Sequence, residues 1–210
     1  MTRPSRKKNR RGEKQLNLVG IDEAGRGPLA GPVAVGAVLL PRGFDAALLC
    51  GVRDSKQLTP RAREEWYAQM LTWRRGGFLS FSVALVGAAH IDRAGIVSAI
   101  NLALRRSLAR LSADPESSRI LLDGGLRAPA HYEYQETIIR GDESEEVIAL
   151  ASIAAKVVRD RHMRRLSLMH PEYDFSVHKG YGTAAHYRAL KKHGISPVHR
   201  RSFLRSPRGS

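Results

Sequence analysis

LNLVGIDEAGRGPLAGPVAVGAVLL, residues 16–40, is the stretch that decides the fold. Its apolar run at 16–21 predicts a short buried strand, and two acidic residues follow this run directly. Glycine and proline are concentrated in 24–32, which predicts a loop. The apolar run at 33–40, ended by a proline, predicts a second strand. The stretch therefore predicts two neighbouring strands, with two carboxylates at the end of the first.

Outside this stretch, the spacing of apolar residues predicts three more strands and four helices. The strands are expected at 78–85, 119–122 and 137–139, and the helices at 96–111, at 184–192, around the apolar stripe of 147–157, and over about 14 residues from Pro60, with Thr59 as N-cap. Three strands followed by alternating strands and helices are typical of an α/β fold with a mixed sheet covered by helices.

The composition indicates one globular domain. The chain has 210 residues, of which 42% are hydrophobic and 26% charged, and this balance excludes a wholly disordered chain. No uncharged stretch reaches the roughly 20 apolar residues of a membrane span, and the first apolar run is too short for a signal peptide. Cys50 is the single cysteine and cannot form an intrachain disulfide. We therefore expect a soluble cytoplasmic protein without a membrane partner.

The positive charge is concentrated at the two ends of the chain. The formal net charge is +15, from 35 Lys and Arg against 20 Asp and Glu. Residues 1–14 contribute +6 and residues 175–210 contribute +8, which leaves +1 for the residues between them. Solubility alone is an alternative explanation for one basic end, but two basic ends favour nucleic acid as the partner. We expect a disordered basic arm at 1–15, one domain at 16–204 and a flexible tail at 205–210.

Four carboxylates follow predicted strands: Asp22 and Glu23 after the first, Asp123 after the fourth and Asp142 after the fifth. Side chains from distant parts of a sequence meet at the strand ends of an α/β sheet, and clustered carboxylates are typical of Mg²⁺ sites. Each acid also has a structural interpretation. Asp142 could cap a helix, with Glu145 completing a capping box, Asp123 could serve an Asp-Gly turn, and the first two could be solvated strand ends.

Six motifs along the chain resemble the ribonuclease HII family, in that family's order and spacing. They are GIDEAGRGPLAGP at 20–32, DSKQL at 54–58, LDG at 122–124, GD at 141–142 followed by ASIAAKVVRD at 151–160, HKGYGT at 178–183 and HRRSF at 199–203. A single Asp-Gly has no value as evidence, whereas six ordered motifs over residues 17–203 are specific.

The resemblance implies an RNase H-like fold, with a five-stranded mixed sheet flanked by helices and a helical C-terminal part. It implies that Asp22, Glu23, Asp123 and Asp142 are catalytic acids that bind two Mg²⁺ or Mn²⁺ ions. It also implies cleavage of the phosphodiester on the 5′ side of a ribonucleotide, in RNA–DNA hybrids or in duplex DNA, leaving a 3′-hydroxyl and a 5′-phosphate.

The resemblance further implies five substrate-binding residues: Gly25, Arg26, Gly27, Lys56 and Tyr181. The first three form the loop that meets the ribonucleotide, where a bare backbone can approach a 2′-hydroxyl. The tyrosine corresponds to the family's tyrosine that packs against the sugar on the 3′ side of the junction. A monomer is expected, and recruitment by a sliding clamp is left open.

The sequence departs from the family pattern after Asp142, where Glu143, Ser144 and Glu145 replace a small residue, Lys and Ser. A ribonuclease HIII-like nuclease is disfavoured, because only about 15 residues precede the first strand and the fourth acid is Asp. A non-catalytic basic module that binds nucleic acid would leave the four acids unexplained. The histidines show no zinc-ligand spacing and are interpreted as structural or surface residues: His90, His131, His162, His170, His186 and His193.

Overall fold

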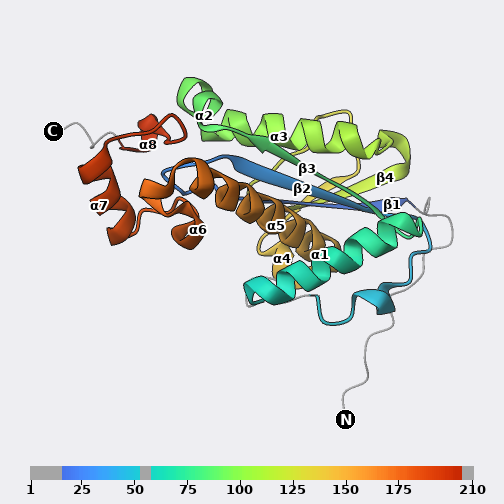
Figure 1. Cartoon of the computed structure of the whole chain (residues 1–210). Helices are drawn as coiled ribbons and strands as arrows, with labels where there is room; N and C mark the ends of the chain where they lie inside the picture. The colour runs from blue at the N-terminus through green and yellow to red at the C-terminus, as the bar shows by residue number, and fades with distance from the viewer. Residues whose placement is uncertain (1–15, 53–57, 205–210) are drawn as a thin grey trace, which may run out of the picture.

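The computed structural model describes residues 16–52 and 58–204 (Figure 1). The predicted arm at 1–15, the predicted tail at 205–210 and Lys56 lie outside the described residues. Within the part that is described, no helix is both long enough and apolar enough to cross a membrane.

The centre of the molecule is a five-stranded mixed sheet with the order β3-β2-β1-β4-β5. The strands are β1 (Asn17–Ala24), β2 (Val33–Leu40), β3 (Ser80–Val86), β4 (Ser118–Asp123) and β5 (Gln135–Ile138). The first three pair antiparallel, while β1 with β4 and β4 with β5 pair parallel. The expected α/β fold with a five-stranded mixed sheet is therefore confirmed.

Helices cover both faces of the sheet and form the C-terminal part (Figure 1). The α-helices are α1 (Pro60–Arg75), α2 (Ala88–Ala94), α3 (Ile96–Leu111), α4 (Gly141–Ser144), α5 (Glu146–Met169), α6 (Phe175–His178), α7 (Ala184–His193) and α8 (Arg201–Leu204), and the short 3-10 turns are η1 (Ala46–Leu49), η2 (Pro115–Ser117) and η3 (Pro171–Tyr173). One face of the sheet packs against α3, and the other packs against α1 and α5. Thr59 caps α1 as expected, because its hydroxyl accepts a hydrogen bond from the backbone N–H of Ala62.

Two glycines let α5 lie directly on the sheet. A methyl group on Gly20 of β1 would stand 2.3 Å from the carbonyl oxygen of Val147, and one on Gly36 of β2 would stand 2.3 Å from that of Ala151. Both contacts are with helix backbone, which cannot move aside as a flexible side chain could. The absence of a side chain at these two positions therefore sets how closely α5 approaches the strand ends.

The first strand is longer than the sequence predicted. The apolar run ends at Ile21, but the ladder with β2 continues as far as the pair Ala24–Ala34. Asp22 and Glu23 therefore lie inside β1 rather than after it, and Asp123 is the last residue of β4. A partner strand supplies hydrogen bonds to the backbone whatever the side chains are, so charge alone does not end a strand.

We predict that Gly36→Ala lowers the free energy of unfolding by about 1–3 kcal/mol, because the new methyl group forces α5 away from the sheet. Gly87→Ala is the matched control, since a methyl group there meets nothing within 4 Å. Urea unfolding curves of the two variants and the wild type measure the difference. Equal stability of the two variants would contradict the close approach of α5.

Candidate active site

The ends of β1 and β4 bring two of the predicted acids to the same edge of the sheet. These strands are parallel neighbours whose register pairs Ile21 with Leu122, so Asp22 and Asp123 occupy the next position on each strand. Side chains alternate along a strand, so Asp22 lies on the same face as Gly20, toward α5. Only 5% of Asp22 is exposed. The two acids therefore meet at a buried strand edge beneath α5.

Burial and neighbouring negative charge raise the pKa of the Asp22 carboxyl from 3.8 to about 7. Burial is the main cause, and the carboxylates of Glu23 and Asp123 add to it. The nearby hydroxyl of Ser152 on α5 and the backbone N–H of Glu23, which donates to Asp22 Oδ1 at 2.7 Å, lower this pKa in part. The site thus holds a carboxylate that is costly to ionise unless a positive charge accompanies it.

A backbone hydrogen bond ties the fourth predicted acid to this edge. Asp123 Oδ1 accepts a hydrogen bond of 2.7 Å from the N–H of Gly141, the residue before Asp142. Asp142 is 1% exposed and lies inside the short α4, whose N-cap is Arg140. The alternative interpretation of Asp142 as a helix cap is therefore wrong. Glu143 and Ser144, which differ from the family pattern, are exposed.

Glu23 lies at the mouth of the site and contacts the glycine-rich loop. Its Oε1 atom is 3.4 Å from Nη1 of Arg26, with which it forms an ion pair. Burial raises the pKa of Glu23, the nearby Arg26 lowers it, and Asp123 raises it further. This acid therefore links the strand-end carboxylates to the loop that follows β1.

The acids are suitable ligands for a divalent cation, but they are not arranged as a complete coordination site. Across residues 16–52 and 58–204, no three His, Cys, Asp or Glu side chains are gathered closely enough to hold a metal ion as they stand. Carboxylate oxygens are the ligands that Mg²⁺ and Mn²⁺ prefer, and a cation would relieve the repulsion that raises the pKa of Asp22. Mg²⁺ is usually bound by one or two carboxylates and completed by water and substrate phosphates.

A pocket of about 440 Å³ opens beside Glu23 and gathers the predicted substrate-binding residues that the structure describes. It is lined by Glu23, Ala24, Gly25, Arg26, Gly27, Arg63, Lys156, Arg159, Asp160, Lys179 and Tyr181. The lining contains five cationic side chains and two carboxylates. Such an excess of positive charge is suited to a phosphate backbone.

Two buried arginines hold the loop that forms one wall of this pocket. Arg200 is fully buried and donates to the carbonyl oxygens of Gly25, Arg26 and Gly31 at 2.7, 2.9 and 2.9 Å. Burial, together with the positive charge of Arg159, lowers the pKa of Arg200 to about 9. The loop carbonyls therefore take the place of a carboxylate as the partners of this guanidinium.

Arg159 of α5 holds the same loop from the other side and joins it to the segment that carries Tyr181. Its guanidinium donates to the carbonyl oxygens of Pro32 at 2.9 Å, Lys179 at 3.0 Å and Ala30 at 3.4 Å. The N–H of Leu29 also donates to the carbonyl of Gly180 at 2.8 Å. Loop and tyrosine segment therefore form one connected wall.

The two glycines that flank Arg26 have different surroundings. Gly25 has a φ of +84°, and a methyl group there would stand 1.9 Å from Nε of Arg159, so packing alone requires glycine. A methyl group on Gly27 would meet nothing within 4 Å. Packing within the described protein therefore explains Gly25 and leaves the glycine at 27 unexplained.

Sequence reasoning missed four cations of the pocket wall: Arg63, Lys156, Arg159 and Lys179. The last three lie inside motifs that were recognised at 151–160 and 178–183, so the signal was present but only Tyr181 was taken from it. Arg63 lies on α1, outside every motif, and its approach depends on how α1 packs. Lys56 lies outside the described residues.

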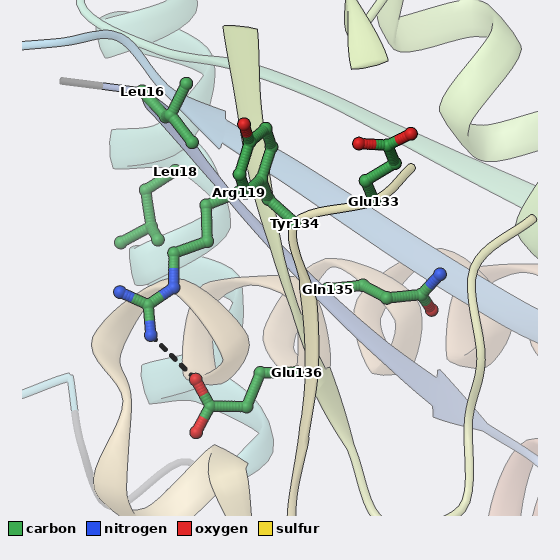
Figure 2. Close-up of a pocket in the computed structure, with 7 residues that line it drawn as sticks. All are labelled: Leu16, Leu18, Arg119, Glu133, Tyr134, Gln135 and Glu136. Carbon is green, nitrogen blue, oxygen red and sulfur yellow. Dashed lines mark hydrogen bonds and ion pairs between the residues drawn. The ribbon is translucent and has the colours of Figure 1, made fainter. Parts of the chain in front are cut away.

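A second pocket, of about 660 Å³, lies at the β5 edge of the sheet and contains none of the predicted site residues (Figure 2). Its lining includes Leu16, Leu18 and Tyr134, together with an exposed ion pair of 2.7 Å between Arg119 and Glu136. It has neither the buried acids nor the excess of cations that the first pocket shows.

Comparisons with known proteins agree with this geometry. The family model for ribonuclease HII matches residues 19–206. A ribonuclease HII from Coxiella burnetii is 43% identical over 188 residues, which are 90% of this chain and 88% of that protein.

Solved structures show the same fold. The RNase HII in a complex with PCNA from Archaeoglobus fulgidus has a TM-score of 0.69 and 26% identity, over 89% of this chain and 93% of that one. Bst-RNase HIII in complex with Mn²⁺ has a TM-score of 0.64 over 90% of this chain and 65% of that one, and at 21% identity it shows the fold alone. Because the family model spans nearly the whole described fold, this chain belongs to the ribonuclease HII family and is an RNase H-type endonuclease.

Proposed function

We propose that this enzyme hydrolyses the phosphodiester on the 5′ side of ribonucleotides, both in RNA–DNA hybrids and at single ribonucleotides in duplex DNA. The observation that carries this proposal is the pocket beside Glu23, which joins an acidic strand edge, a backbone-lined loop, an exposed tyrosine and five cations. A phosphate held by the cations would lie next to the acids, with its sugar against the loop.

Asp22, Glu23, Asp123 and Asp142 would hold Mg²⁺ or Mn²⁺ in the proposed mechanism. When bound, such ions activate the attacking water and stabilise the charge on the leaving oxygen of a phosphodiester. Attack on phosphorus breaks the bond to the 3′-oxygen, which leaves a 3′-hydroxyl and a 5′-phosphate. The N–H of Glu23 donates to Asp22 and the N–H of Gly141 donates to Asp123, both at 2.7 Å, so backbone donors of β1 and α4 orient the two carboxylates.

The loop from Gly25 to Gly27 would recognise the ribonucleotide through its backbone. Arg200 occupies the carbonyls of Gly25 and Arg26, and the open space over Gly27 leaves room for a sugar. Tyr181 is 49% exposed on the same wall and offers its ring as a surface for the following sugar. Lys56 is proposed as a further substrate contact from the second motif.

We further propose that the enzyme acts as a cytoplasmic monomer whose partners are hybrids and ribonucleotide-containing duplexes. The Archaeoglobus RNase HII is found in a complex with PCNA, which makes a sliding clamp the protein partner to test. Removal of ribonucleotides from DNA during repair and replication is the role that this substrate preference supports.

The function is tested with a duplex that contains one ribonucleotide, compared with the same duplex in all-DNA form. We expect a single nick on the 5′ side of the ribonucleotide in Mg²⁺ or Mn²⁺, no cutting of all-DNA, and no activity with a chelator. Asp22→Asn and Asp123→Asn should each lower the rate by more than about 100-fold, since several kcal/mol of charge stabilisation are lost.

Duplex affinity of the two variants should stay within about threefold of wild type, because the cationic wall is intact. Glu116 is exposed and does not line the pocket beside Glu23, so Glu116→Gln is the matched control and should cut normally. Near-normal turnover by either aspartate variant, or cutting of the all-DNA duplex, would refute the assigned chemistry.

Asp22→Asn should stabilise the metal-free protein at pH 8. The folded-state pKa of about 7 lies above the unfolded value of 3.8, so the folded protein binds the extra proton and loses stability as the pH rises from about 4 to 7. A shift of this size corresponds to roughly 4 kcal/mol at most. Urea unfolding in a chelator should show the gain at pH 8 and little difference at pH 4. A variant that is no more stable than wild type at pH 8 would argue against a destabilised Asp22 carboxylate.

Tyr181→Ala should slow cleavage at a single ribonucleotide more than cleavage of a long RNA–DNA hybrid, where many registers are available. Tyr181→Phe keeps the ring and should stay close to wild type on both substrates. The measurement is the initial rate of each variant on both substrates at fixed salt and Mg²⁺. Equal losses of Tyr181→Ala on the two substrates would mean that this tyrosine is only structural.

A further inference from the structure

Three histidines are buried beneath the segment that carries Tyr181 and have no role in the chemistry described above. His178, His186 and His199 come from α6, α7 and the segment before α8, and all are buried, with His186 fully enclosed. The rings of His178 and His186 stack with their centroids 4.4 Å apart. Among the described residues they do not belong to any group that could hold a metal ion.

Hydrogen bonds from backbone groups fix the proton of each ring, because a backbone N–H can only donate. The N–H of Ser196 at 3.0 Å and its hydroxyl at 2.8 Å both face Nδ1 of His199. Because the N–H can only donate, this nitrogen accepts and the proton of His199 is on Nε2. That proton faces Nε2 of His186 at 2.9 Å, which must therefore accept. The proton of His186 is then on Nδ1, from which it is donated to the carbonyl oxygen of Tyr181 at 2.9 Å.

The third histidine, His178, contacts the N–H group of Tyr181. Gly180 N–H donates to Nδ1 of His178 at 3.2 Å, so His178 carries its proton on Nε2 and donates it to the carbonyl of Tyr173 at 2.6 Å. The N–H of Tyr181 donates to the carbonyl of His178 at 2.9 Å. The N–H of Tyr181 is therefore held by the backbone of His178, and its carbonyl accepts from the ring of His186 and from the N–H of Thr183 at 2.8 Å.

We propose that Ser196, His199 and His186 form a hydrogen-bonded chain of neutral side chains that positions Tyr181, and that protonation of either histidine breaks the chain. A second proton on His199 would be on Nδ1 and would face the backbone N–H of Ser196. A second proton on His186 would be on Nε2 and would face the Nε2–H group of His199. This inference rests on the proposed function of Tyr181 for its effect on selectivity, but not for the tautomers or the position of the backbone.

The surroundings disfavour protonation. His170, His178 and Tyr173 pack around the pair, and the guanidinium of Arg200 follows His199 directly in the sequence. Burial lowers the pKa of His199 to about 4, and the neighbouring histidines add to this, while burial also lowers the pKa of His186. Because the folded-state pKa of His199 lies below the ordinary 6.5, the chain is intact at neutral pH, and its link through His199 is lost as the pH falls toward 4.

The tautomers are tested first, by nitrogen-15 NMR of the imidazole rings in the full chain. We expect His199 and His178 as the Nε2–H form and His186 as the Nδ1–H form at pH 7, with His199 still neutral at pH 5.5. Exposed His193 provides the reference signal. The opposite tautomer of His186, or a protonated His199 at pH 5.5, would overturn the proposal whatever Tyr181 does in cleavage.

Two amide replacements of His186 separate positioning from packing. Asn places its NH₂ group where Nδ1 donates to Tyr181, whereas Gln reaches the Nε2 position and leaves the carbonyl of Tyr181 without this donor. His186→Gln should shift the Tyr181 backbone amide resonance and lower the ratio of single-ribonucleotide to hybrid cleavage by about tenfold to 100-fold. His186→Asn should retain both, and His193→Gln is the surface control.

The outcomes distinguish this inference from the proposed function. Equal resonance shifts in His186→Asn and His186→Gln would overturn the positioning role. If the shifts differ as expected while Tyr181→Ala leaves the cleavage ratio unchanged, the chain of histidines stands and the proposed use of Tyr181 fails.

Discussion

Hydrogen bonds from two buried guanidinium groups to backbone carbonyls are the interactions on which the site depends. Arg159 and Arg200 each donate to three carbonyl oxygens, five of which belong to the loop between β1 and β2. A buried cation is costly unless it is hydrogen bonded, and a buried carbonyl is costly unless it accepts, so each group satisfies the other. These bonds fix the loop through its carbonyl oxygens, while the N–H groups of Leu29 and Gly31 donate to the carbonyls of Gly180 and Val198.

The acidic edge of the sheet has the opposite character, since its groups are not mutually satisfied. Asp22 and Asp123 lie at neighbouring positions of the parallel strands β1 and β4 beneath α5, and burial together with like charge raises the pKa of Asp22 to about 7. Such an arrangement lowers the stability of the folded protein and is retained where function needs it. A loop whose carbonyl oxygens are hydrogen bonded therefore lies beside carboxylates that repel one another, and the loop and Glu23 both contribute to the lining of the pocket.

The sequence predicted the elements and the acids better than the contacts. The approximate positions of the strands along the chain and the helix at Ile96–Leu111 follow from local apolar patterns, which act within one turn or one pleat. The extension of β1 to Ala24 was missed because it depends on a partner strand. Arg159 and Arg200 lie in recognised motifs, yet their targets are carbonyls far away in the sequence, which no local pattern encodes. Lys56 lies outside the described residues and stays a prediction.

The bond between Arg200 and Gly25 has a consequence for the synthesis of this protein. It closes a loop of 175 residues, so the donor is synthesised long after the acceptor. A nascent chain on the ribosome already contains the four acids, but the loop after β1 lacks one of its two guanidinium anchors until Arg200 has emerged from the exit tunnel. In the order of synthesis, the wall beside the acids is thus anchored last, after all five strands and α5 have been made.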